Sequence, residues 1–313
     1  LQSRGLGDVY KRQIIPGGRA MLLQEKMKNT KFSPSEEIVI DFILTKQERI
    51  KDYSTTMIAG ETYTSPSLLV RISKKLGFSG YNNFKNAFLE EVQYLHKSHL
   101  NIDANQPFLK TDSIMNIANK ITQLKTESLN DTLSLIHHDT LQKAVRALQK
   151  SNTVKVFGVS NLSFPAEEFV FKLRHIGKNA EVFVLNSNIY QEAMMANSND
   201  LGICLSYSGE SGEIIKIANI LKKKNVPIIA ITSIGENSLT RLADIVLRVT
   251  TREKSYSKIG AYSSLESISL ILDVLYSCFF TTAYDQHYTF KTELAKNTES
   301  REITNLIIQE NEQ

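Results

Sequence analysis

The side chains of this sequence with the clearest capacity for chemistry are serine hydroxyls that follow an apolar run. Ser206, Ser208 and Ser211 come directly after Leu201–Leu205 and before an amphipathic stretch that contains Ile214. A loop that leaves the carboxyl end of a parallel strand and opens a helix presents free backbone N–H groups and the positive end of the helix dipole. Because hydroxyls add neutral donors suited to phosphate oxygens, the spacing predicts an anion-binding loop.

A second polar turn has the same arrangement. Gly158, Ser160 and Asn161 follow the β-rich run that starts at Val154, and a helical pattern comes after them. Two such turns could face one crevice. Neither contains the G-x-G-x-x-G pattern of dinucleotide sites or the lysine-containing end of a P-loop, which argues against a nucleotide. An ordinary serine- and glycine-rich turn without a ligand is the open alternative.

A different chemistry, DNA recognition, is indicated nearer the N-terminus. A helical pattern starts at Ser65-Pro66 and stops at Gly77, and small polar and cationic residues lie along it. In a helix-turn-helix the second helix enters the major groove, where an arginine can form two hydrogen bonds to guanine and lysines contact phosphates. The residues expected at DNA are Ser65, Ser67, Arg71, Lys74, Lys75 and Lys85. A solvated surface helix is the alternative.

The composition is that of a soluble globular protein, since 42% of the 313 residues are hydrophobic and 22% are charged. The formal net charge of +4 is too small to indicate nucleic acid by itself, so the local grouping of cations matters more. Cys204 and Cys278 form no paired motif, which predicts neither a disulfide nor a zinc site and fits a cytoplasmic location. The apolar stretch 268–284 is interrupted by Asp273 and predicts a buried helix, so no membrane is expected.

The first part of the chain carries helical signals only. Residues 21–100 begin with a capping box at Ser33 and Glu36 and predict an all-α helix-turn-helix domain. Residues 1–20 are predicted to be disordered or non-native. Residues 101–112 predict a linker, after which Asp112 is expected to cap a long helix.

The spacing of hydrophobic residues changes in the second part of the chain. Residues 113–313 start with helices and then contain short apolar runs, with helical patterns between most of them. Nearly continuous apolar runs indicate strands covered on both faces, which predicts an α/β domain with a parallel sheet flanked by helices. The predicted strands are Val154–Val159, Val182–Leu185, Leu201–Leu205, Pro227–Ile231 and Ile245–Val249.

Both parts resemble one known family. The string from Ser65 to Tyr81, continued by Asn-Asn-Phe-Lys over 82–85, resembles the N-terminal domain of RpiR-family transcriptional regulators, as does the opening Ser-Pro-Ser-Glu over 33–36. The string Ser-Tyr-Ser-Gly-Glu-Ser over 206–211, with the segments 228–233 and 242–247 after it, resembles a sugar isomerase (SIS) domain. The order of the two parts is that of the RpiR family.

The resemblance implies a regulator of carbohydrate metabolism that binds a double-stranded DNA operator as a homodimer or tetramer. It implies modulation by a phosphorylated sugar, with no enzymatic activity and no cofactor. Ser206, Ser208 and Ser211 would hold the phosphate, with Ser160 and Asn161 near the sugar. Three positions depart from the usual family pattern: Leu162 replaces a serine, Ser211 a threonine and Leu265 an arginine.

The rival hypothesis is an SIS-type sugar-phosphate isomerase. His175, Glu168 and Glu266 would be its candidate acid and base groups. The pairs His96–His99 and His137–His138 have no third ligand in register, so no metal site is predicted.

Overall fold

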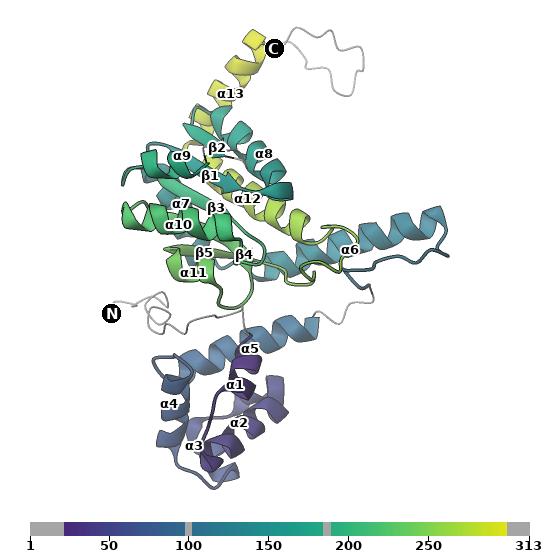
Figure 1. The fold of residues 1–313 in the computed structure, drawn as a ribbon, viewed down its shortest axis with the longest axis vertical. Coiled ribbons are helices and arrows are strands. Elements are labelled where there is room, and N and C mark those ends of the chain that lie inside the picture. The colour runs from purple at the N-terminus through teal and green to yellow at the C-terminus, as the bar shows by residue number, and fades with distance from the viewer. Residues whose placement is uncertain (1–21, 98–101, 184–188, 299–313) are drawn as a thin grey trace.

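The computed structural model describes residues 22–97, 102–183 and 189–298. Figure 1 shows a group of helices, α1 to α5, followed by a sheet with helices on both faces. The sequence-based interpretations of residues 1–20, of His99 and of the last two residues of Val182–Leu185 lie outside the described residues.

The N-terminal helices pack around a core of their own. Their bounds are α1 (Leu23–Asn29), α2 (Pro34–Lys46), the 3-10 helix η2 (Gln47–Asp52), α3 (Thr55–Glu61), α4 (Pro66–Lys75) and α5 (Tyr81–Lys97). The capping box predicted at Ser33 and Glu36 is present, and Pro34 is the first residue of α2. Buried side chains of α2, α4 and α5, such as Ile43, Leu69 and Phe88, meet in one cluster. Each contributes about 1.5–3 kcal/mol by leaving water.

The sheet is parallel throughout, as predicted. It contains β1 (Val154–Gly158), β2 (Ala180–Phe183), β3 (Leu201–Leu205), β4 (Ile228–Ser233) and β5 (Ile245–Val249) in the order β2-β1-β3-β4-β5. The predicted strands are confirmed to within a residue or two, and β2 begins two residues earlier than expected. The charged Glu181 interrupts the apolar run near the start of β2, so the run alone marks that start less sharply.

Helices cover both faces of the sheet. One face packs against α7 (His138–Lys150), α8 (Ser163–Arg174) and α12 (Ser264–Phe280), and the other packs against α9 (Ile189–Met195), α10 (Gly212–Lys223) and α11 (Ser238–Leu242). Neighbouring residues of β3 illustrate the alternation, since Ile203 contributes to the first cluster and Cys204 to the second. The predicted fold class, an all-α domain followed by an α/β domain, is confirmed.

The long helix α6 (Ile114–Ser134) precedes the sheet, and its cap differs from the prediction. Ser113 is the N-cap residue, because its hydroxyl accepts the N–H of Asn116 at 3.3 Å. The carboxylate of Asp112 accepts the N–H of Leu109 at 2.8 Å and pairs with Lys120 at 2.7 Å instead. The expected Asp112 cap is therefore wrong by one residue.

The apolar helix near the C-terminus is buried only in its first part. The stretch Ser264–Thr298, which comprises α12, η4 (Thr281–Ala283) and α13 (Tyr284–Thr298), is long and apolar enough to cross a membrane by length and composition alone. In α12, Ile268, Ile271 and Leu275 belong to the core of the sheet domain. At the end of the stretch 268–284 the predicted burial does not hold, since Tyr284 is exposed; Tyr288, which follows it, is exposed as well.

Candidate DNA-contacting helix and phosphate loop

The helix expected to contact DNA, α4, has one face in the helical core and the other in solvent. Leu68, Leu69 and Ile72 are buried, whereas the Arg71 side chain is 67% exposed. The outward face carries Ser65, Ser67, Arg71, Lys74 and Lys75. Ser65 is the N-cap residue, but its hydroxyl lies 2.9 Å from that of Ser67 rather than capping the helix. Five of the six predicted DNA residues therefore share one accessible surface.

Two of these cations share one carboxylate. Arg71 Nε donates to Glu36 Oε1 at 3.3 Å, and Lys75 Nζ donates to Glu36 Oε2 at 3.0 Å. Glu36 is buried and also accepts the backbone N–H of Ser33 at 2.9 Å. That backbone hydrogen bond and the lysine outweigh desolvation and lower the pKa of Glu36 to about 2. Glu36 thus stays ionised and positions both cations.

Lys85 of α5 lies apart from the other predicted DNA residues. Its ammonium group donates to the carbonyl oxygens of Lys51 at 2.6 Å and Tyr53 at 2.9 Å. These carbonyls lie at the carboxyl end of η2, where a cation is stabilised by unpaired backbone acceptors. Lys85 therefore joins two helical elements in this structure.

Sequence reasoning did not single out Tyr63, which lies in the turn between α3 and α4. Its backbone has φ of 51°, in the left-handed region that favours glycine, and the residue is 98% exposed. The sequence marked this segment only as a break between helices. The turn thus carries a strained, solvent-exposed aromatic residue next to the start of α4.

The two polar turns leave adjacent strands at the same edge of the sheet. Gly158 at the end of β1 pairs in register with Leu205 at the end of β3. From there the chain crosses to β2 on one side and to β4 on the other, so the turns flank the point where the strand order reverses. Ligands of open α/β sheets bind at such a point, in the crevice outside the carboxyl ends of the strands.

The first turn is tight. A Cβ on Gly158 would lie 2.6 Å from the carbonyl oxygen of Leu162, so this position requires glycine. Ser160 has φ of 56°, and both Ser160 and Asn161 are exposed. The short helix η3 (Ser160–Leu162) then leads into α8. A left-handed non-glycine residue at such a crevice is typical of functional loops.

In the second turn each of the three predicted serines bonds within its own loop. The Ser206 hydroxyl accepts the N–H of Gly209 at 3.1 Å, and the Ser208 hydroxyl accepts that of Glu210 at 3.2 Å. Ser211 is the N-cap residue of α10, but its hydroxyl donates to Glu213 Oε2 at 3.1 Å and makes no cap bond. The first turn of α10 therefore lacks a side-chain cap, as an anion-binding helix end requires.

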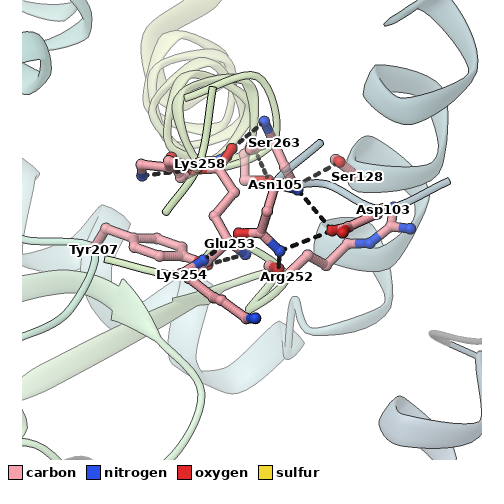
Figure 2. A network of polar contacts seen from close by, with 11 residues as sticks. Asp103, Asn105, Ser128, Tyr207, Arg252, Glu253, Lys254, Lys258 and Ser263 are labelled. Atoms are coloured by element: carbon pink, nitrogen blue, oxygen red, sulfur yellow. Dashed lines mark hydrogen bonds and ion pairs between the residues drawn. The ribbon is translucent and has the colours of Figure 1, made fainter. Parts of the chain in front are cut away.

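Figure 2 shows a polar network that the sequence did not indicate. Tyr207, between two of the predicted serines, points to Glu253 and exchanges two hydrogen bonds with its backbone. Asn105, from the segment predicted as a linker, bonds the residues on either side of Glu253. Tyr207 lies 46 residues from Glu253, and Asn105 lies 147 residues from Arg252 and 149 from Lys254, so only the fold brings these partners together.

The candidate acid and base groups of the rival hypothesis are placed differently. His175 follows α8 at its carboxyl end, about 18 Å along the helix from the first turn. Glu168 pairs with Lys172 at 2.7 Å. Glu266, in the first turn of α12, pairs with Lys125 of α6. The three groups therefore have separate partners, and Glu266 lies on a different helix from His175 and Glu168.

Two families match successive parts of the chain. Residues 20–94 match the helix-turn-helix domain of the rpiR family, and residues 147–278 match the SIS domain. An uncharacterized HTH-type transcriptional regulator of Clostridium perfringens is 26% identical over 259 residues, which are 82% of this chain and 91% of the relative.

Solved structures share the fold. The NanR protein of Vibrio vulnificus, complexed with ManNAc-6P, aligns with a TM-score of 0.54 and 23% identity, over 88% of this chain and 97% of that one. The sugar isomerase domain of an RpiR transcription factor from Sphaerobacter thermophilus aligns with a TM-score of 0.53 and 19% identity, over 57% and 98%. The chain thus carries a helix-turn-helix domain of the rpiR family at residues 20–94, followed by a SIS domain at residues 147–278.

Proposed function

We propose that this protein is a regulator of carbohydrate metabolism whose affinity for a DNA operator is modulated by a phosphorylated sugar. The observation that carries the proposal is the pairing of an exposed basic helix with two polar turns at the strand-order reversal of an SIS sheet. The residues that contact DNA are Ser65, Ser67, Arg71, Lys74 and Lys75. Lys85 joins η2 to α5 and contacts a phosphate only if its hydrogen bonds to the carbonyls of Lys51 and Tyr53 break. The protein acts in the cytoplasm as a homodimer or tetramer.

The effector binds between the two turns. Its phosphate accepts hydrogen bonds from Ser206, Ser208, Ser211 and the uncapped first turn of α10, and its sugar lies near Ser160 and Asn161. Glu213 holds the Ser211 hydroxyl at 3.1 Å, so the phosphate has to displace that carboxylate. ManNAc-6P, which the Vibrio protein is complexed with, is one compound of the expected class.

The DNA side is tested with Arg71→Ala, using a duplex that the full chain selects from a randomised pool. Loss of a bidentate contact to guanine lowers affinity by about 1–3 kcal/mol, or roughly 5- to 150-fold, in fluorescence anisotropy. Arg146→Ala, which removes the same charge from α7, is the matched control. Equal affinity of the Arg71→Ala variant and the wild type would refute the DNA role of α4.

The sugar-phosphate side is tested by thermal shift with N-acetylmannosamine 6-phosphate, glucosamine 6-phosphate, fructose 6-phosphate and inorganic phosphate. A ligand at 100 times its Kd stabilises the native state by about 2.7 kcal/mol, and Ser208→Ala reduces the shift. Turnover of any of these sugars that Glu266→Gln abolishes would favour the isomerase hypothesis instead.

A further inference from the structure

Asn105 anchors the segment that follows the DNA-binding domain onto the SIS domain. Its side-chain oxygen accepts the N–H of Lys254 at 2.6 Å, and its backbone carbonyl accepts the N–H of Ile259 at 2.9 Å. Its amide nitrogen donates to Asp103 at 2.9 Å and, at 3.4 Å, to the carbonyl of Arg252. Asn105 is 8% exposed, so these bonds are shielded from water and break only at a cost.

Tyr207 fastens the serine-rich loop to the same backbone. Its hydroxyl accepts the N–H of Glu253 at 2.9 Å and donates to the carbonyl of Glu253 at 3.2 Å. The Glu253 carboxylate is buried in turn, accepting the N–H groups of Ser263 and Ser264 at the start of α12. Tyr207 and Asn105 bond the same two peptide groups, since Tyr207 bonds the N–H and carbonyl of Glu253, and Asn105 bonds the carbonyl of Arg252 and the N–H of Lys254, as Figure 2 shows.

Arg252, in the same network, is buried and only partly paired among the described residues. Its side chain is 6% exposed, and Nη2 pairs with Glu127 of α6 at 3.2 Å. Its other nitrogen, Nη1, is buried with no hydrogen-bond partner among residues 22–97, 102–183 and 189–298. A buried donor without an acceptor costs about 1–3 kcal/mol, which lowers the energy gap to any arrangement that satisfies it.

We propose that Asp103, Asn105, Tyr207, Arg252, Glu253 and Lys254, here named the Asn105 latch, transmit occupancy of the serine-rich loop to the segment leading to the DNA-binding domain. The inference rests on the function proposed above. A phosphate on Ser206 and Ser208 changes the backbone on both sides of Tyr207. Because Tyr207 holds Glu253, and Asn105 holds the residues flanking it, the segment 102–105 responds to that change.

The test is a coupling measurement on the full chain. The Kd for the selected duplex is measured with and without a saturating concentration of the sugar phosphate that gives the largest thermal shift in the panel above. The ratio of the two Kd values measures the coupling and is expected to be roughly 5- to 150-fold for the wild type. Asn105→Ala and Tyr207→Phe should each reduce this ratio at least threefold, while both variants still bind the duplex.

Asn197→Ala is the matched control. Asn197 makes the same kind of contacts, since its backbone N–H and side-chain amide donate to Asp200 and its side-chain oxygen accepts a backbone N–H, but it lies outside the latch. Its ratio should equal that of the wild type. If Asn105→Ala does not fold, Tyr207→Phe decides, because it keeps the ring and removes only the hydroxyl.

Each outcome is decisive. A wild-type ratio retained by either folded latch variant overturns the latch while leaving the proposed function intact. A wild type that binds both ligands without coupling overturns the latch and the modulation of DNA binding together. If no sugar phosphate binds, the proposed effector site fails first. Hydrogen exchange gives a second readout, since the effector should alter exchange in peptides covering 102–112 of the wild type but not of Asn105→Ala.

Discussion

The candidate DNA site on α4 and the candidate effector site at the sheet edge use different kinds of polar groups. On α4 the polar groups are long charged side chains, and another helix positions two of them through Glu36. At the strand-order reversal the polar groups are short hydroxyls and backbone N–H groups, and the backbone itself sets their positions through Gly158, Ser160 and Gly209. Charge placement can be tuned by one neighbouring side chain. Loop geometry cannot, and so we expect the SIS site to tolerate less change.

Among the variants that test this difference between the two sites, the largest loss of stability is expected for Gly209→Ala. A Cβ there would lie 2.0 Å from Asn237 Cγ, and the residue has φ of 68°. Strain and overpacking together should make Gly209→Ala less stable by about 2–4 kcal/mol, and the variant should lose the effector-induced thermal shift. Urea denaturation measures the first effect and the thermal shift measures the second.

Gly212→Ala is the control for that variant. Gly212 opens α10 in the same loop, but a Cβ there meets nothing within 4 Å. Its stability should stay within about 1 kcal/mol of the wild type. Equal losses in the two variants would contradict the claim that backbone conformation holds the site.

Glu36→Gln tests how much the carboxylate beside the charged site on α4 contributes to stability. The folded-state pKa of about 2 lies below the ordinary 4.5, so the ionised carboxylate stabilises the fold above pH 4.5 and loses this effect as the pH falls toward 2. The variant should be about 2 kcal/mol less stable at pH 7, and the difference should shrink between pH 4.5 and pH 2.

The same variant should bind non-specific duplex DNA more tightly, because removing one negative charge beside Arg71 and Lys75 strengthens phosphate attraction. Glu37→Gln removes the same charge from the next, exposed residue of α2 and serves as the control. A pH-independent difference in stability between Glu36→Gln and the wild type would show that the paired carboxylate does not stabilise the fold.

The smallest effect is expected at Tyr63. Glycine adopts φ of 51° without the steric cost that tyrosine has, so Tyr63→Gly should raise stability by up to about 1 kcal/mol in urea denaturation. Tyr256 is 95% exposed and has no positive φ, and Tyr256→Gly should not stabilise the protein. If Tyr63→Gly and Tyr256→Gly both stabilise the protein, or if neither does, the backbone of Tyr63 is not strained.

The features that could be predicted from the sequence are those that depend on the spacing of hydrophobic residues. The apolar runs located β3 and β5 to the residue, although β3 is fully buried and β5 is a half-buried edge strand. The placement of the two turns at one edge of the sheet followed from parallel strands separated by helices. The partners of charged groups were not predictable, because Glu36 and Arg71 meet only through the packing of α2 on α4. Asn105 lay in a segment without periodicity, whose one signal was the nearby Asp103 with which it forms a turn.

The shared carboxylate on α2 has a consequence for how this protein would respond to ionic strength. DNA binding weakens with salt by a log–log slope of about −0.9 for each phosphate neutralised. Arg71, Lys74 and Lys75 offer three positive charges, but Glu36 offsets one of them, which leaves an effective two per chain and a slope of about −1.8 for one chain, or about −3.6 for the proposed dimer. Without the Glu36 carboxylate the slope of the dimer would be steeper, at about −5.4, so this carboxylate should make operator binding less sensitive to salt.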